Sequence, residues 1–131
     1  MIAIDTPGAT LTFVTVRGRR IADSVKVAAT FSARRRGLLD YQSLPANAGL
    51  LLSPGGSIHT FGMHYPIDVL FLDEHMRVLK WVPCLQPWRV ALAPTGTSYV
   101  LELAAGRAAA SGIQIGARLF WLESTAVDVH R

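Results

Sequence analysis

The sequence predicts a mainly β (α+β) fold, a single small mixed β-barrel or rolled sheet of about seven strands with two short helices. Short apolar runs recur along the chain, and turn signals containing many of its 11 Gly and 7 Pro residues separate them. These runs do not alternate regularly with helical segments, which argues against a doubly wound parallel sheet. Of the 131 residues 50% are hydrophobic, which is enough to bury one core.

The chain begins with a predicted β-hairpin. Residues 11–16 are β-branched and aromatic, Arg17–Arg19 form a turn, and residues 21–28 give the returning strand. Thr30 is a suitable N-cap for a short helix over residues 31–39.

The middle of the chain predicts one short strand and a second hairpin. Residues 49–52 are apolar and end at a strong turn signal, the Ser-Pro-Gly-Gly of residues 53–56. Residues 67–72 form a mostly apolar strand, which we expect to be covered on both faces apart from its one acidic position. A polar turn at residues 73–76 reverses the chain, and we expect residues 77–82 to pair with the preceding strand.

The last third of the chain is interrupted by prolines. Residues 83–94 contain three of them and cannot form a central strand. Residues 98–103 predict another strand, and residues 104–111 predict a short Ala-rich helix that ends at Gly112. Residues 116–122 predict the last strand.

One domain is predicted over residues 9–123, with flexible tails at residues 1–8 and 124–131. No apolar run approaches the roughly 20 residues that cross a bilayer, so we expect no membrane contact. The first residues lack the basic and apolar regions of a signal peptide, and the single Cys84 excludes an internal disulfide. These observations predict a cytoplasmic protein.

The net charge of +4 comes entirely from the N-terminal half. Residues 1–65 hold seven Lys and Arg against three Asp and Glu, whereas the rest of the chain holds six of each. The arginines of residues 17–20 and 34–36 could make the protein an anion or nucleic-acid binder. We expect them to be solvated turn and helix faces, because few short basic runs are nucleic-acid sites, and nucleic acid is not a predicted partner.

Four segments together follow a recurring pattern. They are Thr30-x-x-x-Arg34-x-x-Gly37-Leu38-Leu39, Ile58-His-Thr-Phe-Gly-Met63-x-x-Pro66-Ile67-Asp68, Ser98-Tyr-Val-Leu-Glu102-Leu-x-Ala-Gly106 and Gly112-Ile-x-x-Gly116. They resemble the uncharacterised bacterial and archaeal family catalogued as domain of unknown function 192, over residues 24–122. The chain is similar to the His-Thr-Phe-Gly-Met variant, which is often followed by Pro-Trp-Arg, here residues 87–89. The resemblance implies a compact, mostly β domain and supplies no established activity.

Four residues offer an alternative function, a hydrolase or metal-dependent enzyme that uses His59, His64, Asp68 and Cys84. Positions five apart, such as His59 and His64, point to opposite faces of a strand, and on a helix they miss the shared face. A lone cysteine is most often a packing residue. We therefore predict no catalytic residue, no metal and no cofactor.

Asp68 and Glu102 each interrupt an apolar strand. An ionised carboxylate in such a place needs a partner, and the family motif retains both Arg34 and Asp68. We expect a structural ion pair of Arg34 with Asp68 or Glu102, in preference to a catalytic pair of acids.

A polar groove is the predicted functional feature. Glycine and proline keep residues 59–68 from completing a regular ladder, and residues 83–94 cannot pair regularly, so the two segments should wall a cleft. Trp88 and Arg89 would give it an aromatic and cationic rim. The predicted function is non-catalytic binding of a small molecule or a protein segment. The predicted groove residues are His59, Thr60, Met63, Asp68, Trp88, Arg89 and Tyr99.

Overall fold

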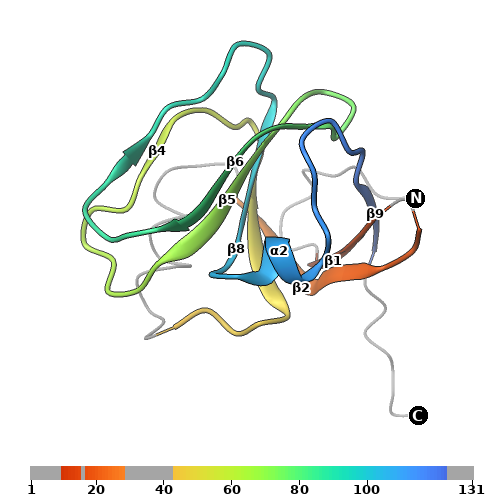
Figure 1. The fold of residues 1–131 in the computed structure, drawn as a ribbon, viewed down its shortest axis with the longest axis horizontal. Helices are drawn as coiled ribbons and strands as arrows, with labels where there is room; N and C mark the ends of the chain where they lie inside the picture. Colours follow the sequence, from red (N-terminus) through yellow and green to blue (C-terminus); the bar gives the residue numbers. More distant parts are fainter. Residues whose placement is uncertain (1–9, 16, 29–42, 124–131) are drawn as a thin grey trace.

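The computed structural model describes residues 10–15, 17–28 and 43–123, and this part of the chain is mainly β, as predicted. It forms nine strands and one short helix, whose arrangement is drawn in Figure 1. The predicted helix over residues 31–39 and the predicted tails lie outside the described residues. The elements are β1 (Thr10–Val14), β2 (Arg20–Ala28), β3 (Ala48–Leu52), β4 (Ile58–His59), β5 (Ile67–Leu72), β6 (Val78–Leu85), β7 (Val90–Ala91), β8 (Tyr99–Ala104), α2 (Arg107–Ala110) and β9 (Phe120–Glu123).

Seven strands form one mixed sheet in the order β6-β5-β8-β3-β2-β1-β9. Strands β2 and β3 are parallel, and the other neighbours are antiparallel. The sheet does not close into a barrel, so the rolled sheet is confirmed and the barrel alternative is wrong. Its two ends approach each other at a single bridge between Arg77 and Arg118, where Val78 N also donates to Ala117 O at 2.9 Å.

Strands β5 and β6 form the predicted antiparallel hairpin. β5 has the predicted bounds because its apolar run lies inside the sheet, between β6 and β8. β6 continues beyond the predicted end at Val82, through Pro83 to Leu85. This correction follows from its place at the edge of the sheet, where a residue without an amide proton is tolerated.

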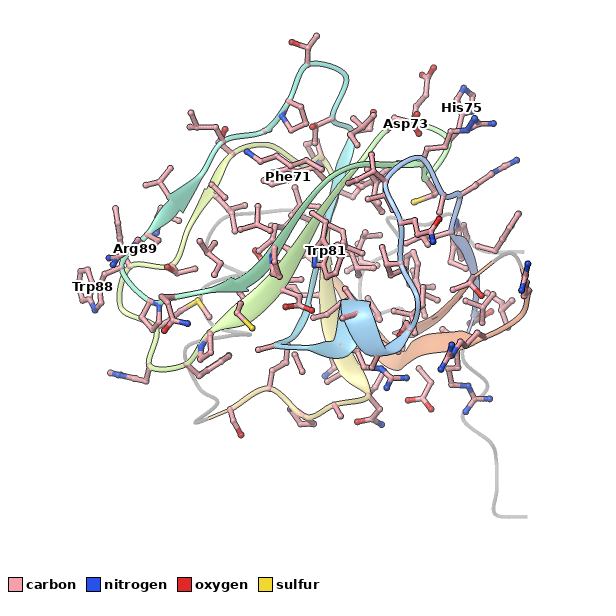
Figure 2. The ribbon with its side chains drawn as sticks, in the orientation of Figure 1. Phe71, Asp73, His75, Trp81, Trp88 and Arg89 are labelled. Carbon is pink, nitrogen blue, oxygen red and sulfur yellow. The ribbon has the colours of Figure 1, made fainter. Side chains whose placement is uncertain are left out.

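Asp73 holds the turn between β5 and β6, at the upper right of Figure 2. Its Oδ1 accepts hydrogen bonds from the amides of His75 at 2.8 Å and Arg77 at 2.9 Å. Burial pushes the pKa of Asp73 upward. The two amide bonds and the charges of His75 and Arg77 outweigh burial, so the pKa lies below its ordinary value.

We expect the Asp73 carboxyl to titrate below an aspartate in a short unstructured peptide. Because its folded pKa is lower, the stabilising contribution of this turn is complete above the unfolded pKa of about 3.9 and is lost as the pH falls through the folded pKa. Carbon-13 NMR of the side-chain carboxyl measures the titration, and Asp73→Asn should remove this acid dependence. A carboxyl that titrates at or above the peptide value contradicts the prediction.

Hydrophobic side chains cover both faces of the sheet. Along β5, Ile67, Val69 and Phe71 belong to one buried cluster, and Leu70 and Leu72 belong to the other. This alternation follows from the two-residue period of a strand. It confirms that both faces of this strand are covered.

The helix α2 is shorter than predicted. It covers Arg107–Ala110 in place of residues 104–111, because Gly106, just before it, takes a left-handed φ of 86°. Gly112 follows the helix with a φ of 74°, as expected for a glycine after a helix end. No helix in the described part of the chain is long and apolar enough to cross a membrane.

The last strand starts later than predicted. β9 begins at Phe120 in place of residue 116. Gly116 takes a φ of 87° and turns the chain, and Arg118 then forms an isolated bridge before the regular strand begins.

Candidate functional site

The two irregular segments of the predicted groove are joined directly to each other. Strands β4 and β7 form a two-stranded ladder that pairs residues 58–59 with residues 90–91. Beyond the ladder, Thr60 N donates to Arg89 O at 2.9 Å and Trp88 N donates to Thr60 O at 3.0 Å. The segments therefore lie side by side, and at these residues hydrogen bonds join them in place of an open cleft.

The buried side chain of Thr60 stabilises this contact between the two segments. Its side chain is fully buried, and its hydroxyl donates to Gln86 O at 2.7 Å and accepts from Arg89 N at 2.9 Å. A hydroxyl that both donates and accepts ties residues 86–89 to β4 through its side chain as well as its backbone. Thr60 therefore holds the two segments together and, being buried, does not contribute to the solvent-exposed surface.

Three rings stack outside this junction, and we term them the aromatic ledge: His59, Phe61 and Trp88. The centroids of His59 and Phe61 are 4.4 Å apart and those of Phe61 and Trp88 are 5.8 Å apart, with interplanar angles of 21° and 25°. The Phe61 amide donates to His59 Nδ1 at 3.2 Å, which orients the imidazole. Sequence reasoning missed Phe61, although it lies inside the motif that indicated the groove.

Two of the three rings of the ledge are exposed, His59 is half-buried, and the backbone of the ledge is constrained. Trp88 is 63% exposed and Phe61 is 43% exposed. Trp88 takes a φ of 63°, a left-handed conformation that is uncommon for a residue with a side chain. Such a conformation persists where the surroundings impose it, and here the bonds of Thr60 to Trp88 and Arg89 do so. Figure 2 shows Trp88 and Arg89 at the outer edge of the molecule.

Two further apolar side chains continue the ledge along β7. Val90 is 54% exposed and Leu92 is 66% exposed, whereas Ala91 between them is buried. Val90 is opposite His59 in the β4–β7 register, so these two side chains share a face, and Leu92, two residues further along, lies on the same face. Arg89 Nη1 donates to Trp88 O at 3.4 Å, so a cation lies beside this apolar row. The sequence analysis did not predict this surface, although the alternation of large apolar residues after Pro87 could have indicated it.

Of the remaining predicted groove residues, Met63 adjoins the junction, where its amide donates to Thr60 O at 3.2 Å, and Asp68 and Tyr99 lie elsewhere. Met63 is buried in the cluster that contains Val100, and Asp68 is fully buried. Tyr99 packs against the other cluster, because neighbouring residues of β8 point to opposite faces. The predicted residues that the structure brings together are His59, Thr60, Trp88 and Arg89, with the buried Met63 beneath them.

Asp68 binds two backbone amides. Its Oδ1 accepts from Cys84 N and its Oδ2 accepts from Ala108 N, both at 2.9 Å. Residues 83–84 both lie opposite Asp68 in the β5–β6 pairing, which makes a β-bulge. Cys84 takes a φ of 48° in this bulge, and its amide meets the carboxylate. Asp68 therefore ties the bulge of β6 to the first turn of α2.

Asp68 and Glu102 lie on opposite faces of the sheet. In the β5–β8 register, Asp68 is opposite Leu103 and Val69 is opposite Glu102. Leu103 and Val69 belong to different hydrophobic clusters. The two buried carboxylates therefore cannot act as one acid pair. Arg34 lies outside the described residues, so its ion pair with either acid stays a prediction.

The residues of the alternative enzyme hypothesis are not gathered into a metal site. His64 and Cys84 are exposed, whereas Asp68 is buried and accepts amide bonds. Over residues 10–15, 17–28 and 43–123, no group of three or more His, Cys, Asp or Glu side chains could hold a metal ion.

Comparison with known sequences identifies related proteins. The model of the DUF192 family, described as Uncharacterized ACR, COG1430, matches residues 12–121. The UPF0127 protein of Pyrococcus horikoshii is 31% identical over 102 residues, which cover 74% of this chain and 86% of the relative. The UPF0127 protein of Thermococcus sibiricus is 32% identical over 113 residues, which cover 80% and 70% of the two chains.

Two crystal structures share the fold. One, from Sinorhizobium meliloti 1021 and named as a proposed transcription regulator, has a TM-score of 0.73 at 24% identity and covers 85% of this chain and 91% of its own. The other, a protein of unknown function from Novosphingobium aromaticivorans, has a TM-score of 0.71 at 23% identity and covers 85% and 83%. At these identities the likeness is one of fold. Because the family model spans most of the chain and includes the His-Thr-Phe-Gly-Met segment, the protein belongs to the DUF192 family, as its motifs predicted.

Proposed function

We propose that this chain is a non-catalytic binding domain, and that the aromatic ledge with Val90 and Leu92 contacts an extended segment of a partner protein that carries aromatic and acidic side chains. The observation that carries the proposal is the stack of His59, Phe61 and Trp88, in which Phe61 and Trp88 are exposed although backbone hydrogen bonds hold the segments that carry them. Single exposed apolar residues are common on protein surfaces, but a contiguous group of them marks an interaction site.

The constrained backbone of the ledge supports this role. The junction at Thr60 holds the backbone of Trp88 in its left-handed conformation, and the stack on Phe61 at 5.8 Å orients its ring. A preorganised side chain loses less conformational entropy on binding than a mobile one. Tryptophan is also enriched among the few residues that dominate interface energies.

Arg89 indicates the chemistry of the partner segment. Its side chain is exposed beside Trp88, and no carboxylate among the described residues forms an ion pair with it. A segment that carries an acidic side chain next to an aromatic one would match both groups. The proposed partner is therefore an acidic, aromatic peptide segment.

We also propose that the domain works in the cytoplasm. Cys84 is free and exposed. A reducing compartment keeps such a thiol unoxidised.

Trp88→Ala is expected to remove most of the binding to such segments. Selection from a phage-displayed library of random linear peptides on the wild-type protein should enrich an acidic residue beside Trp, Phe or Tyr. The affinity of the enriched peptides, measured by fluorescence anisotropy, should fall about thirtyfold in Trp88→Ala, as for a central interface tryptophan. Arg89→Gln should weaken the acidic peptides and leave neutral ones unchanged.

Leu122→Ala and Ile115→Ala are the matched controls. Their side chains are 54% and 60% exposed, close to the values for Val90 and Leu92, but they belong to β9 and the segment before it. Both variants should keep the wild-type affinity. Enriched peptides that bind Trp88→Ala as tightly as the wild type would refute the proposal. A dimer that is lost in Trp88→Ala, with no enrichment of peptides, would refute it in favour of a second copy.

A further inference from the structure

We infer that a second site, separate from the aromatic ledge, binds a small phosphate-bearing anion. A cavity of about 430 Å³, open to solvent, lies between the turn that joins β1 to β2 and the segment that joins α2 to β9. Arg17, Arg19 and Arg118 are among the residues that line it. This volume is in the range of natural small-molecule sites and suits a sugar phosphate or a mononucleotide.

The lining of the cavity carries hydrogen-bond donors and no acid. Thr15, Ser111 and Gln114 add polar side chains, and Ile113 and Leu119 supply an apolar wall; none of the lining residues is Asp or Glu. Guanidinium groups bind phosphate through paired N–H donors, and these charge-assisted bonds are among the strongest in proteins. The apolar wall would contact the carbon-bearing part of the ligand.

Two contacts position the arginines. Arg19 Nη1 lies 3.8 Å from the place that a Cβ on Gly112 would occupy, so this side chain reaches from the hairpin turn to the residues after α2. The Arg118 guanidinium lies 5.2 Å from the centre of the Phe120 ring, within cation–π range. The fold thus brings together cations that are far apart in the sequence.

The positive charge at this cavity is concentrated. Arg17, Arg19 and Arg118 form no ion pair with a carboxylate of the described residues. The isolated bridge also places Arg77 directly opposite Arg118, and like charges in opposed positions of a sheet repel. Asp73 accepts a bond from the Arg77 amide, so one acid adjoins the outer side of this group. A bound anion would relieve the remaining repulsion.

The convergence of these arginines favours a small ligand over a nucleic acid. A nucleic-acid site follows the phosphate backbone along an extended basic groove, whereas these three side chains line one cavity. Arg20, the first residue of β2 directly after this turn, does not line the cavity and pairs with Asp23 at 3.2 Å. The arginines of residues 17–20, which we expected to be a solvated turn, therefore differ in role. Arg17 and Arg19 would bind the anion, and Arg20 pairs with Asp23.

Titration with inorganic pyrophosphate at low ionic strength tests the site. We expect saturable binding by calorimetry, with amide NMR shifts concentrated at residues 111–119. The dissociation constant should rise about tenfold in each of Arg17→Gln, Arg19→Gln and Arg118→Gln, because each removes a charge-assisted contact. Arg20→Gln makes the same charge change in the same turn and should alter the dissociation constant by less than about twofold.

Each alternative has a defined result. Equal weakening by Arg20→Gln and the cavity variants would show a response to net charge alone and would overturn the proposal. Citrate that binds as tightly as pyrophosphate would overturn the assignment to phosphate. A single-stranded oligonucleotide that binds more tightly and needs the same arginines would overturn the small-ligand assignment. Thermal melting of the variants should match the wild type, since exposed side chains seldom affect stability, and this excludes unfolding as the cause.

Discussion

Replacing Asp68 with alanine is expected to lower the free energy of unfolding by about 3–5 kcal/mol, because two hydrogen bonds to a buried charged acceptor are lost together. Asp68 and Ala108 are both fully buried, so water does not replace the carboxylate at the Ala108 amide, whereas the bond to the Cys84 amide is partly buried. Each buried amide left without an acceptor costs about 1–3 kcal/mol. The variant no longer buries a charge, which offsets part of this loss.

Urea unfolding measures the change, and Asp23→Ala is the control. Asp23 is partly exposed and bonds Arg20 at 3.2 Å and Asn47 at 3.0 Å, an arrangement that contributes less than about 1 kcal/mol at a surface. If Asp68→Ala does not fold, Asp68→Asn, which keeps one acceptor oxygen, carries the test. Hydrogen exchange should then show lost protection at the amide of Cys84 or Ala108. An Asp68→Asn protein as stable as Asp23→Ala, with both amides protected, contradicts the prediction.

The strands and hairpins were predictable because their signals are local. Residues 67–72 combine an apolar run with a polar turn directly after it, and the structure places β5 at those bounds, paired with β6. The same holds for β1 and β2, whose Arg-Gly-Arg turn is read directly from the sequence. A short-range pattern of this kind depends on the residues that form it and needs no knowledge of distant segments.

The partners of the buried polar groups were not predictable, because pairing across the fold decides them. The pairing of β6 with β5 shifts register at residues 83–84 and forms a bulge there. This bulge brings the Cys84 amide to Asp68. The other amide, at Ala108, comes from a helix far along the chain. The parallel pairing of β2 with β3 is likewise a property of the whole sheet.

The position of Thr60 beside residues 86–89 was expected, but the role of its side chain was not. Glycine and proline correctly indicated that the segments of His59 and Trp88 are irregular and near each other. The polar character of Thr60 suggested a groove wall, but its hydroxyl is turned inward to bind Gln86 and Arg89. Residue type alone does not determine whether a hydroxyl faces solvent or satisfies the backbone of a buried loop.

Gly55→Ala is expected to destabilise the protein by about 3 kcal/mol, because the added methyl group has no room beside β8. A Cβ at Gly55 would lie 2.6 Å from Tyr99 C, 2.7 Å from Val100 N and 2.8 Å from Tyr99 Cα. These are backbone atoms of a strand that lies between β5 and β3, so they cannot move aside without disturbing two ladders. The Gly55 amide also donates to Ser98 O at 2.8 Å, which fixes the turn against this strand.

The neighbouring glycine provides the control for this prediction. A Cβ at Gly56 would meet no atom within 4 Å, and its φ lies outside the left-handed region. Gly56→Ala should therefore be neutral, or stabilising by about 0.4–1 kcal/mol, since alanine restricts the unfolded chain more than glycine does. Urea unfolding of the two variants under identical conditions measures the difference. In the sequence both residues are equivalent parts of one turn signal, so only the close approach of Gly55 to Tyr99 and Val100 separates them. Equal unfolding free energies for the two variants would show that the turn shifts away from β8 at little cost.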